Sequence, residues 1–495
     1  MFVICKSNTK LFFWNKKQKK ETEEEGNLSD RPQPPAQRYR SLSQFFQRAK
    51  DLQPSSMGCF RGHFCLFLES LQVEKMSSQV RLKLLPRARC LFDEPIKVKV
   101  EGLRSRQVVT MRARLTDEKG VVFSSSATYR ADGSGEVDLN RDPSLGGTYV
   151  GVEPMGLLWS MRPDTMHKRF QKTKSLEPQL VKFSVYEEEG RILAEETNER
   201  LLIGDGVSGS LSKRGTLVES CSHLQGLAHV DREGLFPAVL DMPTLRSETR
   251  ASLLANKGFV VLSMRAAEAI FQNMQKIHLD HFKEAMDFLK QQPKVGSKGV
   301  GIVGRSKGAD LALSLATFVP GVEAAVCING NSANVGVPLY HKKQKILSPL
   351  MYDLSKLIPT ESGASIGKYI CEDPLAEKTR AASSPLNEQR LISSLWLERM
   401  TSGGTARPTW TRWWRLKRHG KENFESVSYR GAGHLLEPPY EPFCPSSAHG
   451  ILRYLSSWGG QPKAHTAAEV QLWKKIQEFF RTHLSCDPAQ TKAKL

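Results

Sequence analysis

The feature that most constrains this chain is a Gly-x-Ser-x-Gly motif placed between a short apolar run and a helical pattern. The motif occupies residues 304–308, and its central residue is Ser306. Glycines on both sides of a serine permit the sharp turn that joins a strand to a helix, with the serine hydroxyl at the helix N-terminus. The five-residue pattern alone is weak, but a strand before it and a helix after it are what a nucleophile elbow requires. The motif therefore predicts Ser306 as a nucleophile.

Strand and helix patterns alternate on both sides of this motif. Apolar runs at 237–241, 259–262 and 324–330 predict strands, and the spacing at 248–256 and 282–289 predicts helices. Alternating units of this kind build a mostly parallel sheet covered by helices. Such sheets place their chemistry at the carboxyl ends of the strands, which is where we expect the serine.

The preceding part of the chain has a different rhythm. Short runs of alternating polar and apolar residues, such as 96–100 and 109–115, are separated by turn signals. Repeated short strands at this spacing favour an antiparallel β-sandwich, in which no catalytic constellation stands out. The sequence thus predicts a β-sandwich domain over residues 76–215 and an α/β domain over residues 216–484.

The two ends of the chain resemble neither domain. Residues 1–75 contain blocks of like charge and several prolines without periodicity, which predicts a disordered extension and makes Met76 a candidate start. The acidic cluster in this extension argues against a mitochondrial presequence. Residues 485–495 are polar and are expected to form a flexible tail.

Composition excludes several classes of protein. The chain has 39% hydrophobic and 25% charged residues, which is typical of a soluble globular protein, and no apolar run is long enough for a transmembrane segment. Nine scattered cysteines without a Cys-x-x-Cys pair indicate a reducing compartment and no zinc site. The net charge of +19 lies largely in residues 1–75 and 378–418 rather than on a basic face with interleaved aromatics, so nucleic-acid binding is not expected.

Longer blocks of sequence carry a more specific resemblance. They are Leu-Gly-Gly-Thr-Tyr-Val-Gly-Val-Glu-Pro-Met-Gly-Leu-Leu-Trp at 145–159, Arg-Ala-Ser-Leu-Leu-Ala at 250–255, Ser-Lys-Gly at 306–308, Ile-Asn-Gly at 328–330, Gly-His-Leu-Leu-Glu-Pro-Pro-Tyr at 433–440 and Trp-Gly-Gly at 458–460. In this order the blocks resemble the acyl-CoA thioesterase / bile acid-CoA:amino acid N-acyltransferase family. The resemblance implies an N-terminal β-sandwich, a C-terminal α/β-hydrolase domain, and fatty acyl-CoA or bile acyl-CoA as substrate. It implies no metal or redox cofactor, since coenzyme A enters as part of the substrate.

The resemblance also assigns Ser306 as nucleophile and His434 as general base. The chemistry agrees, because a hydroxyl is a weak nucleophile until a base takes its proton, and a thioester carbonyl suits such attack. His434 follows a predicted strand at 426–429, and the chain order of serine before histidine fits this fold. Family members that act as N-acyltransferases often carry cysteine at the nucleophile position, so a serine favours hydrolysis.

The chain departs from its relatives at the third member of the triad. Relatives place an aspartate after a hydrophobic strand, between the serine and the histidine, but this chain has no Asp between Asp373 and Asp487. Residues 381–414 contain four tryptophans, three of them near one another, and no convincing apolar strand, so the triad acid is unknown. Codons can be chosen for residues 394–412 that, read two nucleotides later, restore the family's strand and acidic pair. We therefore hypothesise a shifted reading frame here, which sequencing of the transcript would test.

A second departure lies at residues 241–248, where relatives carry a glycine-rich run. That loop would supply one backbone N–H of the oxyanion hole, and Lys307, the residue after the nucleophile, would supply the other. Loss of one such donor typically costs about 100- to 1,000-fold in turnover. The leading expectation is therefore a serine-dependent acyl-CoA thioesterase that is impaired as written. The alternatives are acyl transfer to glycine or taurine, and a catalytically dead relative that binds acyl-CoA or a protein partner.

The last three residues suggest a location. Ala493, Lys494 and Leu495 form a variant of the Ser-Lys-Leu peroxisomal address, which an import receptor reads from a free C-terminus. An enzyme of acyl-CoA metabolism suits that compartment, so the peroxisome is the expected location. The cytoplasm is the alternative.

Overall fold

The computed structural model describes most of the chain from residue 79 onward. The described residues are 79–173, 176–188, 190–210, 224–230, 233–243, 248–264, 276–374, 376–383, 393–400, 423–484 and 486. All of them belong to one unit, Ser77–Leu495. The predicted extension over 1–75 lies outside the described residues, as do the predicted domain boundary near residue 215 and all of the predicted tail except Cys486.

Two sheets make up the N-terminal part of the described chain. One has the strand order β1 (Arg81–Leu85), β3 (Lys97–Glu101) and β6 (Val137–Asp138). The other has the order β2 (Arg89–Leu91), β10 (Ile192–Leu201), β9 (Gln179–Tyr186), β4 (Val108–Thr116), β5 (Val122–Arg130) and β7 (Gly146–Gly147), with β8 (Arg162–Pro163) also paired to β5. The pairs are antiparallel except for β10 with β2, which are parallel.

Alternating burial along these strands explains why they form. In β4, the side chains of Val109, Met111, Ala113 and Leu115 are buried, and the residues between them are half-buried or exposed. Val98 on β3 belongs to the same hydrophobic cluster, so the two sheets share one core. A strand with one buried face needs this period of two. The predicted β-sandwich is confirmed.

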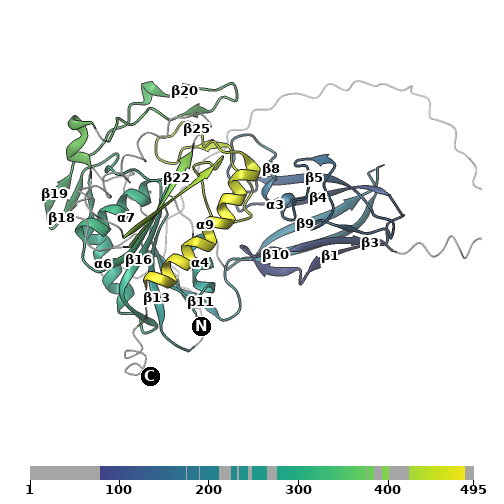
Figure 1. Ribbon diagram of the computed structural model, residues 1–495, viewed down its shortest axis with the longest axis horizontal. Helices are drawn as coiled ribbons and strands as arrows, with labels where there is room; N and C mark the ends of the chain where they lie inside the picture. The colour runs from purple at the N-terminus through teal and green to yellow at the C-terminus, as the bar shows by residue number, and fades with distance from the viewer. Residues whose placement is uncertain are drawn as a thin grey trace, which may run out of the picture. The chain divides into compact units, whose positions relative to one another are not determined.

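The C-terminal part is built on an eight-stranded sheet (Figure 1). Its strand order is β11 (Val207–Ser210), β12 (Leu224–Val230), β14 (Val260–Met264), β13 (Phe236–Met242), β16 (Val295–Arg305), β17 (Val322–Ile328), β22 (Ser393–Met400) and β23 (Phe424–Arg430). The pairs from β14 to β23 are parallel, whereas β12 is antiparallel to both of its neighbours. This order, with one antiparallel strand second from the edge, is that of an α/β-hydrolase, as predicted.

Among the described residues, four helices pack on this sheet: α4 (Thr249–Asn256), α6 (Leu279–Lys290), α7 (Lys307–Phe318) and α9 (Pro462–His483). Val261 and Val303 belong to the same hydrophobic cluster as α4 and α9, whereas Leu262 and Ile302 belong to that of α6 and α7. Successive residues of a strand therefore point to opposite faces of the sheet. One face is covered by α4 and α9, and the other by α6 and α7. Strands buried on both faces read as continuous apolar runs, which is why these strands could be predicted from sequence.

One strand contradicts the sequence analysis. Residues 381–414 were expected to contain no convincing strand, yet β22 pairs with β17 on one side and with β23 on the other. Parallel pairing along both edges compensates for a weak local pattern, since strand formation depends strongly on its neighbours. Residues 401–422, which follow β22, lie outside the described residues, so the reading-frame hypothesis stays a prediction.

The remaining elements of the described residues are short. They are α3 (Gly156–Trp159), β15 (Ile277–His278), β18 (Leu339–His341), β19 (Gln344–Leu347), β20 (Ile358–Pro359), β21 (Ser365–Ile366), β24 (Ser446–Ala448), β25 (Leu455–Ser457) and the 3₁₀ turns Leu354–Lys356 and Glu377–Ala382. Among the described residues, no helix is both long enough and apolar enough to span a membrane.

Candidate active site

Ser306 lies at the sharp turn between β16 and α7, as the motif predicts. Its backbone has φ 55° and ψ −123°, a positive φ that residues with side chains rarely adopt. Its backbone N–H donates to the carbonyl of Ile328 at the end of β17, over 2.9 Å. A side chain at Gly304 would overlap the carbonyl oxygen of Gly308, and one at Gly308 would overlap that of Met242. The turn therefore requires both glycines.

Lys307 is the first residue of α7. Its backbone N–H belongs to the first turn, where no carbonyl four residues earlier in the helix can accept it. Its side chain is buried, and Nζ donates to Oδ1 of Asn334 over 2.9 Å and lies 3.8 Å from Oδ2 of Asp310. Burial lowers the pKa of Lys307. The ammonium group therefore serves an internal polar cluster, and the backbone N–H is the part of Lys307 suited to an oxyanion.

His434 lies on the loop after β23, and its backbone is fixed on both sides. Its N–H donates to the carbonyl of Trp458 over 2.9 Å, and its carbonyl accepts from Nδ2 of Asn329 over 2.9 Å. Asn329 directly follows Ile328, whose carbonyl binds the backbone of Ser306. The structure therefore brings the predicted serine and histidine to the same end of β17.

An aromatic side chain supports the imidazole of His434. The rings of His434 and Trp458 are stacked, with centroids 5.4 Å apart and planes inclined by 15°. Nε1 of Trp458 donates to Oγ of Ser447 over 2.8 Å, which holds the indole in place. Trp458 and Asn329 both occur in the sequence blocks that carry the family resemblance, but neither was predicted to contact the histidine loop. Neither contact has a local sequence signal, because each joins residues far apart in the chain.

Buried ion pairs also connect the segment that carries Ser306 to the loop that carries His434. Arg305, just before the serine, places Nη2 2.7 Å from Oε1 of Glu437, three residues after His434, and Nη2 of Arg169 lies 2.5 Å from the same oxygen. Burial alone would raise the pKa of Glu437, but the positive charges, that of Arg305 foremost, lower it to about 2. Burial and then the charge of Glu437 raise the pKa of Glu441 to about 8.

The loop expected to complete the oxyanion hole begins at the end of β13. Asp241, at that end, is fully buried and accepts from Nε of Arg250 on α4 over 2.6 Å. This ion pair accounts for the arginine in the block at 250–255. Residues 244–247 lie outside the described residues, so the second N–H donor is not placed. The triad acid also stays unassigned, because residues 384–392 and 401–422, between the serine and the histidine, lie outside the described residues.

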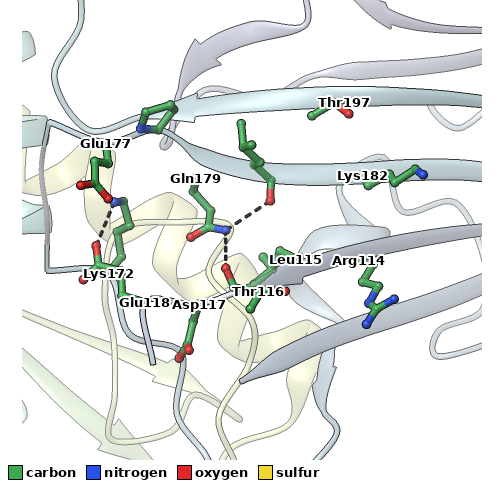
Figure 2. A pocket seen from close by; sticks show the side chains of 12 residues that line it. Arg114, Leu115, Thr116, Asp117, Glu118, Lys172, Glu177, Gln179, Lys182 and Thr197 are labelled. Atoms are coloured by element: carbon green, nitrogen blue, oxygen red, sulfur yellow. Dashed lines mark hydrogen bonds and ion pairs between the residues drawn. The ribbon is translucent and has the colours of Figure 1, made fainter. Parts of the chain in front are cut away.

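A pocket of about 530 Å³ lies on the N-terminal sheets (Figure 2). Nζ of Lys172 lies 2.9 Å from Oε1 of Glu118 at this pocket, and Nε2 of Gln179 donates to the carbonyls of Thr116 and Leu180. Its lining includes none of the predicted site residues. The pocket is therefore separate from the candidate active site.

The sheet order and the nucleophile-elbow geometry define this protein as an α/β-hydrolase. Comparison with protein families narrows the class. Residues 93–210 match the acyl-CoA thioester hydrolase/BAAT N-terminal region, and residues 277–486 match the BAAT / acyl-CoA thioester hydrolase C-terminal model. The chain belongs to this family, and the predicted resemblance is confirmed.

Individual relatives agree with this assignment. The chain is 36% identical to human acyl-coenzyme A thioesterase 2, mitochondrial, over 84% of this chain and 89% of that protein. It is 37% identical to human acyl-coenzyme A thioesterase 6, over 82% and 97%. It is 34% identical to mouse peroxisomal succinyl-coenzyme A thioesterase, over 84% and 99%. Among solved structures, an acylaminoacyl peptidase from Pyrococcus horikoshii matches with a TM-score of 0.33 and 14% identity, covering 79% of this chain and 60% of that chain. The assignment of the fold rests on the strand order of the sheet and not on this match.

Proposed function

We propose that this protein hydrolyses acyl-CoA thioesters with Ser306 as nucleophile. The observation that carries the proposal is the position of Ser306: at the N-terminus of α7, in a strained turn tied to the same strand end as the loop of His434. Strained backbone at such a turn exposes the serine Oγ, and a helix N-terminus favours developing negative charge. The thioesterase names of the relatives support acyl-CoA as the substrate class.

The proposed reaction has two halves. In the first, His434 takes the proton of the Ser306 hydroxyl while its oxygen attacks the thioester carbon, and the Lys307 N–H binds the resulting oxyanion. The C–S bond then breaks, and the histidine gives its proton to the departing coenzyme A thiolate. In the second half, His434 takes a proton from a water molecule that attacks the acyl-serine ester, and returns that proton to the Ser306 oxygen as the free acid leaves. Every proton moves through His434, so the proposal needs no metal or redox cofactor.

The expected rate is low. Without a triad acid to orient the imidazole, turnover falls by about 10⁴-fold in a comparable enzyme. If the residues after β22 supply no carboxylate to His434, the protein as written is an impaired thioesterase. A readout that detects a single acylation event is therefore needed beside steady-state turnover.

Incubation of the purified full chain with palmitoyl-CoA, with and without glycine or taurine, tests the proposal. Release of coenzyme A thiol and mass spectrometry of the product separate hydrolysis (free acid), acyl transfer (conjugate) and binding alone (neither). Ser306→Ala is expected to abolish product formation and labelling by a fluorophosphonate, whereas Ser105→Ala, in an exposed turn, leaves both unchanged. Full activity in Ser306→Ala would exclude the proposed nucleophile, and a conjugate as the main product would favour the acyltransferase alternative.

We also propose a peroxisomal location, read from Ala493, Lys494 and Leu495, which lie outside the described residues. The names of the relatives include both a mitochondrial and a peroxisomal thioesterase, so they do not decide between compartments. A fluorescent protein fused before residues 485–495 is expected in peroxisomal puncta, and deletion of Leu495 should disperse it. Diffuse fluorescence from the intact tail would favour the cytoplasm instead.

A further inference from the structure

A buried histidine on α9 contacts the backbone on both sides of His434. Nδ1 of His465 accepts the N–H of Gly433 over 2.9 Å, and Nε2 of His465 lies 3.2 Å from the carbonyl oxygen of Leu435. Gly433 and Leu435 are the immediate neighbours of His434. One imidazole therefore fixes the two peptide groups that flank the proposed general base.

Only one form of His465 satisfies both contacts. Nδ1 must carry no proton because it accepts from Gly433, and Nε2 must carry the proton that it donates to Leu435. The residue is 4% exposed, so water cannot replace either partner easily. Oε1 of Glu469, one turn further along α9, lies 3.2 Å from Nε2 of His465 and also accepts the N–H of Glu437 over 3.2 Å. The helix therefore holds the histidine loop at three backbone groups.

Contacts from outside α9 also hold the histidine loop. The carbonyls of Gly433 and His434 accept from Asn329 over 3.3 and 2.9 Å, and the N–H of His434 donates to Trp458. A side chain at Gly433 would overlap the carbonyl oxygen of Gly459. His465 contacts the peptide groups on both sides of His434, so loss of these two contacts would let the imidazole of His434 shift.

We propose that His465 is a positioning residue that sets the place of the His434 imidazole relative to Ser306. The inference rests on the proposed function, because it assigns the histidine loop a catalytic role. His465 does not contact the reacting atoms: it acts through the backbone of Gly433 and Leu435. A misplacement of a catalytic group by about 1 Å can cost about 100-fold in rate. Loss of the His465 imidazole should therefore lower turnover while leaving substrate binding nearly unchanged.

Three substitutions separate the two contacts. In His465→Asn, the side-chain oxygen can take the place of Nδ1 and keep the bond from Gly433. In His465→Gln, the longer amide can take the place of Nε2 and keep the bond to Leu435. His465→Leu removes both. His483, exposed on the same helix, gives the matched controls His483→Asn, His483→Gln and His483→Leu.

We expect His465→Leu to lower kcat for palmitoyl-CoA by about 100-fold with KM changed less than about twofold, and the two amide variants to lose less. The His483 controls should keep the kcat of the unaltered protein. Thermal unfolding of each variant establishes the folded fraction to which rates are normalised. If His465→Leu does not fold, the amide variants carry the test. A kcat in the His465 variants equal to that of the His483 controls, or a loss entirely in KM, would overturn the inference.

A second measurement separates this inference from the proposed function. Labelling of Ser306 by a fluorophosphonate needs an activated serine but no acyl-CoA, so its rate reports the serine–histidine pair alone. If the unaltered protein is labelled but does not hydrolyse acyl-CoA, the proposed substrate is wrong, and slower labelling in His465→Leu still supports the inference. If Ser306 is not labelled in the unaltered protein, there is no activated serine for His465 to support, and the inference fails.

Discussion

Ser306 can occupy its turn only because the residues two before and two after it have no side chain. The Cβ of any other residue at position 308 would meet the backbone carbonyl of Met242, at the end of β13. A backbone group cannot rotate away as a flexible side chain can, so the strand end itself would have to move. The same strand end begins the loop that is expected to complete the oxyanion hole.

At the scale of the residue, we therefore expect Gly308→Ala to be costly. Overpacking of this kind typically destabilises a protein by about 1–3 kcal/mol, and displacement of Met242 should also slow the labelling of Ser306. Gly133→Ala is the matched control, because a side chain at Gly133 meets nothing within 4 Å and its φ is not positive. Urea denaturation and fluorophosphonate labelling measure the two effects. Equal unfolding free energies in the two variants would show that the turn tolerates a side chain.

At the scale of the element, apolar runs predicted strands β13, β14, β16 and β17 and the helix after the serine, because burial of these elements leaves a local apolar pattern in the sequence. β22 could not be predicted, since its place depends on pairing with strands on both sides. The apolar pattern over residues 473–480 indicates a helix there, whereas α9 spans Pro462–His483. Its buried large residues, such as Trp473 and Phe480, fall in the second half, and its first turns are built mostly from small and polar residues.

The contacts that hold the candidate site could largely not be predicted either, because they join residues that lie far apart in the sequence. The first turns of α9 carry His465 and Glu469, whose spacing of four residues puts them on one face of the helix. That spacing indicates a local pair, but nothing in it indicates a loop 30 residues away. The Gly-x-Ser-x-Gly motif is different, because strand, turn and helix are contiguous and the geometry is local. Sequence could thus indicate Ser306 and its turn, and could not indicate what holds the loop of His434.

At the scale of the whole molecule, buried polar contacts join the N-terminal sheets to the α/β part. Asp93, which follows β2, accepts from Nε1 of Trp473 on α9 over 2.7 Å and lies 2.8 Å from Nζ of Lys257. Arg169, which follows β8, reaches Glu437 on the histidine loop. A continuous hydrophobic cluster accompanies these contacts and contains residues of β4, α4 and α9. The N-terminal sheets therefore support the same loop that carries His434.

The carboxylate of Glu437 forms ion pairs with both Arg169 and Arg305, so Glu437→Gln tests how much these pairs stabilise the protein. The substitution leaves the mostly buried guanidinium groups of Arg169 and Arg305 without their shared counter-charge, and removal of one partner from a buried pair typically costs about 3–5 kcal/mol. Glu372→Gln is the control, because the ion pair of Glu372 with Lys378 is exposed and should contribute less than about 1 kcal/mol. Urea denaturation at neutral pH gives both values.

The pKa of Glu437 adds a pH dependence with a definite sign. Because this pKa is lowered from 4.5 in the unfolded chain to about 2 in the folded protein, the stabilisation by its charge is fully present above pH 4.5. It is lost as the pH falls from about 4.5 towards about 2, where the folded protein also takes up the proton. The difference in unfolding free energy between the unaltered protein and Glu437→Gln should therefore shrink as the pH falls from about 4.5 towards about 2. A difference that grows as the pH falls would show that Glu437 is not held as a charged partner of the two arginines.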